Sequence, residues 1–369
     1  MSTTRFVSTI PGDTWLLPAT IVLPLGMVAA IVQFVAPGPI STTVIEIYIR
    51  IVAAVAIYMF SGNSGIISYG HVAFMGIGAY ASAWQTCCVA MKPITMHGLP
   101  DFLKTANFPV IPAAIAAGGL AAVVALVAAL VIMRLNSIAA AVATFALLFI
   151  FQSVYGHWDS VTMGVSTVIG LPQYITPVYA WVWVALTVTV AYMLQNSSIG
   201  LMLQASRDEH TAARACGAHI LKFRVIAFST SAFFAGSAGV MLGHLLGTIS
   251  VATYHLDLTF MLLAMIVVGG LRSLSGAVAG VIMVSVIMEI LKLLQVGFSF
   301  GQVSLSLPGG AVQIGVAITM IAILTFKRDG ITGGREFDVE RLLRGAVGRK
   351  EAELSGAGTK ANPAARMGV

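Results

Sequence analysis

The chain has 369 residues, of which 58% are hydrophobic and only 9% are charged. A typical soluble domain is about 25% charged, so this composition leaves too little polar surface to cover a soluble core and excludes a soluble globular protein. The apolar residues fall in long blocks, and blocks of roughly 18 or more are typical of helices that span a bilayer. We therefore expect an all-α fold, a polytopic transmembrane helical bundle surrounded by membrane lipid.

Hydropathy and turn signals divide the chain into about ten helical segments. They form a predicted transmembrane domain over residues 15–326, between a short segment 1–14 and a polar tail 327–369 that we expect to be largely disordered. In chain order the segments lie near residues 15–36, 43–60, 69–91, 108–133, 136–155, 174–195, 225–247, 255–271, 276–297 and 308–326.

The distribution of basic residues predicts the orientation in the membrane. With the N-terminus in the cytoplasm, most Lys and Arg residues fall on the cytoplasmic side, as the positive-inside rule requires. Both termini and the loop 200–224 are then cytoplasmic. This topology also accounts for the net charge of +6 without a nucleic-acid partner, because the basic residues have no interleaved aromatic side chains. Only Arg50, Lys92, Lys104 and Lys292 fall at or near the outer face.

The sequence carries no pattern typical of an enzyme, a metal site or a cofactor site. It contains no GxSxG elbow, HExxH motif or P-loop. Cys87, Cys88 and Cys216 form neither a disulfide framework nor a CxxC metal site. We therefore expect a transport or scaffold protein with no catalytic residues, no metal and no cofactor.

Charged residues inside the apolar segments are functional candidates, because a charge in lipid is costly. Glu46 and Arg50 are four residues apart, and Glu289 and Lys292 are three apart, so each pair can meet on one helix face. We interpret both pairs as structural and Asp257 as a helix cap. No series of acids or histidines crosses the middle of the membrane, which argues against a proton-coupled carrier.

An uncharged polar segment, SGNSGIISYGH, interrupts two apolar helices at residues 61–71. Backbone that leaves the helix inside a membrane is tolerated where it is buried in protein or lines a watery cavity, and broken helices of this kind often hold a substrate. A tight helical hairpin is the alternative. The residues that we expect to line a translocation path are Asn63, Ser64, Ser68, His71 and Phe74.

Glycines at four-residue spacing predict close approach of helices in lipid. They are Gly239, Gly243 and Gly247 in one segment and Gly276 and Gly280 in another.

The loop 200–224 is the largest polar loop within the membrane domain. Helix formers dominate it as far as Cys216, and Gly217 is a natural C-cap, so we expect a short amphipathic helix. With both charge signs, this helix is either a solvated face or a docking element for a soluble partner.

The residues of this loop also resemble a known family. Ala212-Ala213-x-x-x-Gly217, with Glu209 upstream, looks like a loose form of the coupling-loop motif of ABC importer permeases. The surrounding sequence is similar to one branch, the M-type permease of high-affinity branched-chain amino acid transporters, and the resemblance spans roughly residues 43–340. The blocks that carry it are 70–80, 158–164, 207–239, 267–273 and 329–337.

The resemblance implies a larger machine in the bacterial inner membrane. This subunit would pair with a homologous second permease subunit, two cytoplasmic ATPase subunits and a periplasmic solute-binding protein. ATP hydrolysis would drive alternating access, with no cofactor in the permease. The residues that the resemblance places against the ATPase are Arg207, Asp208, Glu209, His210, Ala212, Ala213 and Gly217.

The resemblance favours an amino acid as the solute, and a branched-chain one first. The sequence departs from the family at residues 163–167, where many relatives carry Gly-Gly and an Asn or Asp, and at His210 and Arg214, which replace acids. Related permeases also serve urea, amides and other small organic solutes, so these stay open as alternatives. A stand-alone secondary carrier and a purely structural scaffold are the remaining hypotheses.

Overall fold

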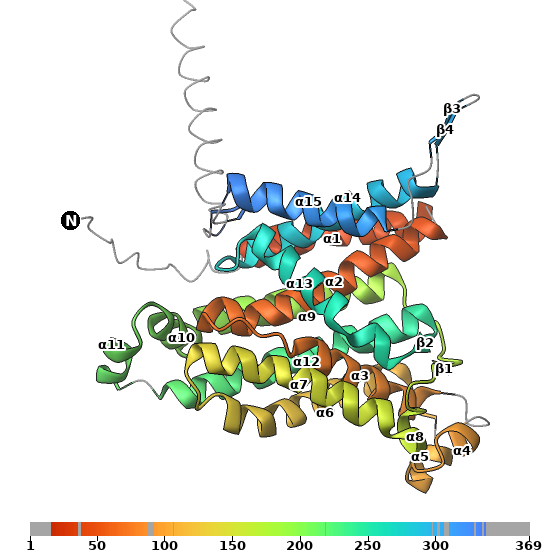
Figure 1. The fold of residues 1–369 in the computed structure, drawn as a ribbon, viewed down its shortest axis with the longest axis horizontal. Helices are drawn as coiled ribbons and strands as arrows, with labels where there is room; N and C mark the ends of the chain where they lie inside the picture. Colours follow the sequence, from red (N-terminus) through yellow and green to blue (C-terminus); the bar gives the residue numbers. More distant parts are fainter. Residues whose placement is uncertain are drawn as a thin grey trace, which may run out of the picture.

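In the computed structural model, every predicted segment forms a helix (Figure 1). The structure describes residues 16–35, 38–87, 92–105, 107–217, 219–296, 298–300, 303–305, 310–327, 330–333 and 336. Segment 1–14, Cys88 and most of the tail 327–369 therefore lie outside the described residues. Within the described residues, eight helices are long and apolar enough to cross a membrane. This confirms the predicted all-α polytopic bundle.

The long helices follow the predicted segments closely, with the largest shifts at the ends of α3 and α12. They are α1 (Leu16–Val35), α2 (Pro39–Ser64), α3 (His71–Thr86), α6 (Val110–Ile132), α7 (Ser137–His157), α9 (Pro177–Asn196), α12 (Ile220–Leu246), α13 (Leu256–Gly269), α14 (Leu274–Val296) and α15 (Ala311–Phe326).

Short elements connect the long helices. The strand pairs are antiparallel, with Val168 opposite Ile249 in the first and Phe298 opposite Leu305 in the second. The short elements are α4 (Lys92–Thr95), α5 (Asp101–Thr105), α8 (Asp159–Thr162), β1 (Val168–Ile169), α10 (Ser198–Asp208), α11 (His210–Ala215), β2 (Thr248–Ile249), η2 (Val251–Tyr254), β3 (Phe298–Phe300) and β4 (Val303–Leu305).

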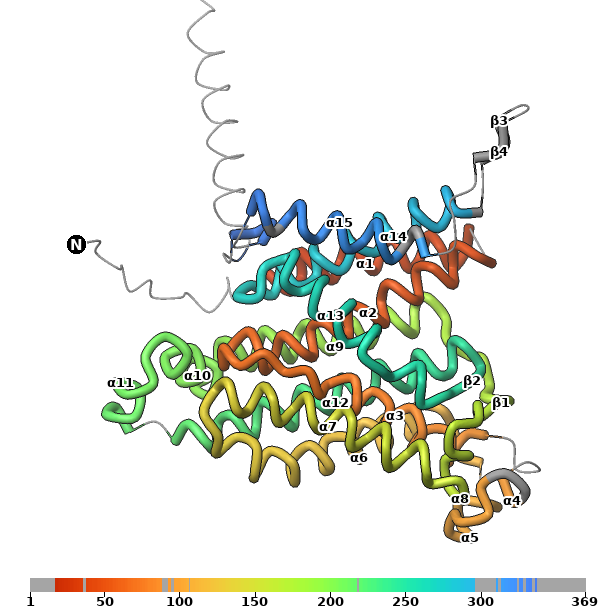
Figure 2. Tube along the Cα trace, in the orientation of Figure 1, coloured from red at the N-terminus to blue at the C-terminus, as the bar shows by residue number. Residues whose placement is uncertain are grey.

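Helices α2 and α12 form the centre of the bundle. Figure 1 shows α1, α13, α14 and α15 on one side of α2 and α9, and α3, α6, α7 and α12 on the other. The same order can be followed along the Cα trace in Figure 2. Every residue of α2 from Tyr48 to Ser64 is buried, which is expected of a helix that is apolar all round. α12 packs against α6, α3 and α2.

Helix α6 has one small-residue face and one bulky face. Ala117, Ala121, Ala125 and Ala129 are fully buried at four-residue spacing, which lets α12 approach closely. The opposite face exposes large aliphatic side chains, with Val131 70% exposed. In a membrane protein this bulky face contacts lipid.

The predicted glycines of α12 fall into different environments. A Cβ at Gly239 would collide with the carbonyl oxygen of Met75 on α3, so this glycine allows the two backbones to touch. A Cβ at Gly243 would lie 2.9 Å from the side chain of Ile249, and Gly247 ends α12. Thus only the first of the three lies at a helix–helix backbone contact.

The two glycines of α14 both lie against α13. A Cβ at Gly276 would lie 2.8 Å from the carbonyl oxygen of Gly269. A Cβ at Gly280 would lie 2.7 Å from Cα of the same residue. The start of α14 is held by Glu336, whose carboxylate accepts the backbone N–H groups of Leu274 at 2.7 Å and Ser275 at 3.1 Å.

Candidate functional site

A cavity of about 1040 Å³ lies between α2, α3, α12, α13 and α15. We call it the central cavity. Most of its wall is aliphatic or thioether, which favours an apolar ligand or ligand side chain. The apolar lining includes Ile49, Ala53, Ile67, Met75, Leu242, Met261, Leu262, Val267, Val316 and Met320.

A network of four charges borders the central cavity. The guanidinium of Arg50 is ion-paired with Glu46 and lies 3.4 Å from the Ser285 hydroxyl on α14. The ammonium of Lys292 lies 3.6 Å from Glu46 and 3.5 Å from Glu289. Both predicted ion pairs are therefore formed, and they join into one neutral network between α2 and α14. Such pairing is what allows charges to be buried in a membrane protein.

Arg50 and Glu46 also line the central cavity, together with Asp257. Asp257 lies in the first turn of α13, but the cap is His255, whose ring nitrogen accepts the N–H of Leu256. Asp257 is exposed and has no ion pair with any residue that the structure describes. The interpretation of Asp257 as the cap was wrong, and its exposed carboxylate is available to a ligand.

The predicted break between α2 and α3 is present. Residues 65–70 are unwound, and Gly65 ends α2 in the left-handed conformation with φ +72°. Ile67 and Tyr69 of this segment line the central cavity. None of the residues expected on the path lines the central cavity in this conformation. Asn63, Ser64, Ser68, His71 and Phe74 are instead packed inside the bundle, at 2% exposure or less.

Two buried histidines form hydrogen bonds between α3 and α12, one near each end of α3. The ring nitrogens of His71 each lie 2.8 Å from a hydroxyl, that of Ser68 in the unwound segment and that of Ser231 on α12. Towards the other end, Nε2 of His244 on α12 lies 2.6 Å from the Ser82 hydroxyl on α3. His71 is thus a packed, hydrogen-bonded residue that holds the unwound segment in place.

The last turn of α2, just before the unwound segment, is bonded to α10 in the predicted coupling loop. Nη1 of Arg207 donates to the carbonyl oxygen of Gly62 at 2.7 Å, and its Cγ would lie 2.5 Å from a Cβ placed on Gly65. The Gln204 amide donates to Oδ1 of Asn63 at 3.0 Å. The end of α2 and the end of α10 are therefore joined through side chains and backbone.

The predicted loop helix is in fact two helices. α10 ends at Asp208, and Glu209 caps α11 by accepting the N–H of Thr211 at 3.4 Å. Of the residues expected to touch an ATPase, Asp208, Glu209, His210, Ala212 and Gly217 are exposed, whereas Ala213 is buried and Arg207 is partly buried against α2. Gly217 adopts φ +82° after the end of α11.

The pKa of His210 is lowered from its ordinary value. The largest cause is slight desolvation of this exposed ring, and the positive charges of Arg224 and Arg214 add to it, while Glu209 acts in the opposite direction. Among the residues that the structure describes, no group of three or more His, Cys, Asp or Glu could hold a metal ion.

Known proteins support the membrane-transport interpretation. The family described as branched-chain amino acid transport system, permease component, matches residues 40–325. A probable ABC transporter permease protein, YphD of Escherichia coli (strain K12), is 29% identical over 133 residues, which is 34% of this chain. That match covers 40% of the length of YphD. No solved structure matches the chain significantly.

Proposed function

We propose that this chain, which belongs to the family of permease components of branched-chain amino acid transport systems, carries an amino acid with a branched aliphatic side chain through its central cavity. The family makes the chain a multi-pass membrane transport subunit. We propose in addition which solute it carries, which subunits drive transport and which cellular membrane holds it. The observation that carries it is the combination, in one cavity, of a mostly apolar lining with three charged residues, Arg50, Glu46 and Asp257.

This combination fits the chemistry of an aliphatic zwitterion. A guanidinium can bind the ligand carboxylate in a bidentate manner, and a free carboxylate such as that of Asp257 can bind the ammonium group. The aliphatic side chain then contacts the apolar wall. Urea and small amides carry no formally charged groups, so they would not need opposite charges at the cavity. They are the alternative solutes.

Coupling to ATP hydrolysis is proposed to run through α10 and α11. Their exposed residues would seat in a groove of a cytoplasmic ATPase subunit. Movement of α10 would pull on Gly62 through Arg207 and would shift the unwound segment 65–70, two of whose residues line the cavity. The buried set Asn63, Ser64, Ser68, His71 and Phe74 would form the closed side of the path in the present conformation.

The complete transporter would contain a homologous second permease, two ATPase subunits and a periplasmic solute-binding protein in the bacterial inner membrane. A tagged chain purified from native membranes in mild detergent should recover the second permease and the ATPases. Recovery of the chain alone, with uptake that needs an ion gradient but no ATP, would instead indicate a secondary carrier.

The recovered complex, reconstituted in proteoliposomes with its binding protein, tests the solute. ATP-driven uptake of leucine should saturate and should exceed uptake of urea or acetamide. Glu46→Gln/Arg50→Gln removes the ion pair as a unit and avoids an unpaired buried charge. This double variant should lower leucine uptake on the order of tenfold, because one charged hydrogen bond to the leucine carboxylate is lost. Lys104→Gln, which removes a charge from an ion pair on short helix α5, is the matched control. Unchanged leucine uptake in the double variant would refute the assignment.

A further inference from the structure

A second pocket, of about 640 Å³, opens between the α6–α7 turn, α10 and α11, and the start of α12. We propose that this basic pocket binds the phosphate of an anionic phospholipid in the membrane leaflet on the α10–α11 side. The proposal is independent of the transported solute. The residues that give the basic pocket its charge are Arg134, Arg207, Arg214 and Arg224, and His210 also lines it.

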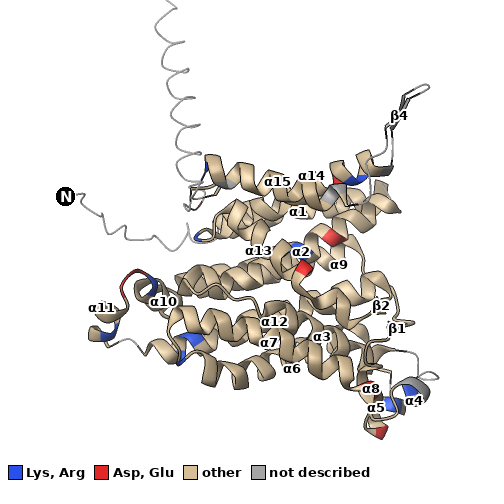
Figure 3. Cartoon of the chain, in the orientation of Figure 1, with Lys and Arg blue, Asp and Glu red and all other residues tan. Residues whose placement is uncertain are grey.

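The pocket gathers positive charge from four separate elements. Arg134 comes from the turn before α7, Arg207 and Arg214 from α10 and α11, and Arg224 from α12. None of the described residues that line the pocket is Asp or Glu. Of the four arginines, only Arg207 has an ion pair among the described residues, with Asp208 at 3.4 Å. Figure 3 shows basic residues gathered at this end of the bundle.

One of these arginines is buried with an unused donor. Arg224 is only 5% exposed, and its Nε has no hydrogen-bond partner among the described residues. A buried charged donor without a partner is unfavourable. An anion in the pocket would supply both a countercharge and an acceptor.

Two helix N-termini reach the same pocket. Asn136 and Ser137 at the start of α7, and Ile220 and Leu221 at the start of α12, all line it. The side chain of His219, the residue before α12, makes no capping hydrogen bond to the first N–H groups of this 27-residue helix. The Asn136 side chain caps α7 by accepting the N–H of Ala139 at 2.9 Å, so it is the start of α12 that lacks a side-chain cap. The positive end of its helix dipole favours a phosphate.

The surroundings of the pocket favour a lipid over a free anion. Leu135 and Leu221 line the pocket and are 41% and 40% exposed. Beyond them, Ile138 is 81% and Val142 is 64% exposed on α7. A phosphate in the pocket would thus have apolar helix surface beside it for acyl chains, as in basic lipid sites between transmembrane helices.

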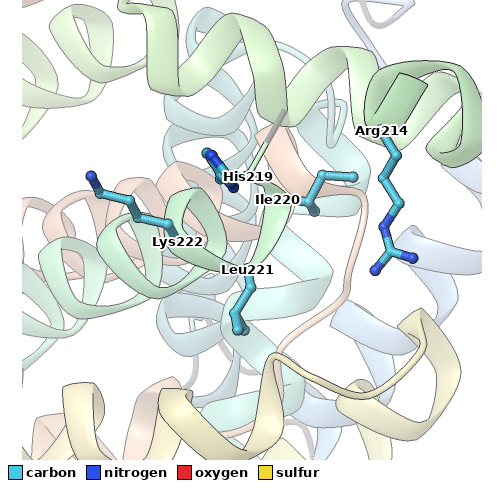
Figure 4. Close-up of a pocket in the computed structure, with 5 residues that line it drawn as sticks. All are labelled: Arg214, His219, Ile220, Leu221 and Lys222. Carbon is cyan, nitrogen blue, oxygen red and sulfur yellow. The ribbon is translucent and has the colours of Figure 1, made fainter. Parts of the chain in front are cut away.

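A neighbouring hollow extends the basic surface around α12. It has a volume of about 540 Å³ and shares Arg214, Ile220 and Leu221 with the basic pocket. Figure 4 shows Arg214 on one side of Ile220 and Leu221, and Lys222 directed to the other side. A glycerol or a second phosphate of the headgroup could therefore meet Lys222.

The test measures lipid retained by the full chain. The purified protein is titrated with phosphatidylglycerol or phosphatidylcholine in detergent, and bound lipid is counted by native mass spectrometry. Arg134 and Arg214 are both exposed, so Arg134→Gln/Arg214→Gln should fold. We expect this variant to bind phosphatidylglycerol on the order of tenfold more weakly, given the contribution of each basic residue near anionic lipid. Binding of phosphatidylcholine should not change.

Arg272→Gln is the matched control, because Arg272 is exposed in the α13–α14 turn and does not line the basic pocket. An equal loss in this variant would reduce the effect to general surface charge and would overturn the proposal. Displacement of phosphatidylglycerol by millimolar inorganic phosphate would assign the pocket to a free anion instead. Complete displacement by added ATPase subunits would assign it to acidic groups of that partner. Retention of phosphatidylglycerol in both experiments supports the lipid site.

Discussion

The contact between α10 and the unwound segment can be tested by adding one methyl group at Gly65. In its left-handed conformation a non-glycine residue costs about 1 kcal/mol or more. The new Cβ would also lie 2.5 Å from Cγ of Arg207, so that side chain must move and its bond to the Gly62 carbonyl is lost. A charged hydrogen bond contributes about 1.5 kcal/mol, at the low end here because Arg207 is partly exposed. Gly65→Ala should therefore lower the free energy of unfolding by about 2.5 kcal/mol.

A double-mutant cycle separates the two contributions. In an Arg207→Ala background, Gly65→Ala should cost only the backbone share of about 1 kcal/mol, which leaves a coupling energy of about 1.5 kcal/mol. Unfolding is measured in mixtures of SDS and a mild detergent. Gly217→Ala is the control, because φ is +82° and nothing lies within 4 Å of an added Cβ. It should cost about 1 kcal/mol in both backgrounds. Strictly additive costs for Gly65 and Arg207 would refute the contact.

Three further outcomes follow from the structure. Gly239→Ala should lower the free energy of unfolding by about 2 kcal/mol, because the methyl group meets the α3 backbone. Gly119→Ala, with open space around it, should be neutral or stabilising in the same assay, and equal effects would contradict the packing. Gly217→Leu should lower ATP-driven uptake about fivefold while ATP hydrolysis persists. Gly217→Ala is the control for backbone strain. A parallel loss of uptake and ATP hydrolysis would contradict a coupling role. The pKa of His210 is lowered in the folded chain. The contribution of His210 to the free energy of unfolding is therefore present above its unfolded pKa of about 6.5 and is lost as pH falls through the pKa of the folded chain. His210→Gln should therefore flatten the dependence of unfolding on pH, and an unchanged slope would contradict the assignment.

The helices were predictable from sequence because their apolar blocks are long and their ends carry proline or glycine. The main discrepancy is the start of α12, predicted at residue 225 and found at Ile220. Lys222 and Arg224 made this stretch look like a loop. Their charges are tolerated because the helix begins at the end of the bundle, beside the basic pocket, which hydropathy cannot detect.

The site was predictable only in part. The break at residues 61–71 was visible as a run of small polar residues, but its direction depends on tertiary packing. The polar side chains of Asn63 and His71 bond to α10 and α12, whereas Ile67 and Tyr69 face the cavity. The ion pair of Glu46 and Arg50 was predictable from spacing alone. Its place beside a cavity was not, because α13 and α15 build the opposite wall.

The bonds between α3 and α12 determine which parts of the bundle can move. His71 and His244 join the two helices towards opposite ends, and at Gly239 their backbones touch. Sliding one helix along the other would break these contacts together, so shear between α3 and α12 is disfavoured. We therefore expect the pair to move as one body. In the proposed alternating-access cycle, relative motion would then fall at the connections that leave this pair, residues 65–70 before α3 and residues 247–255 after α12.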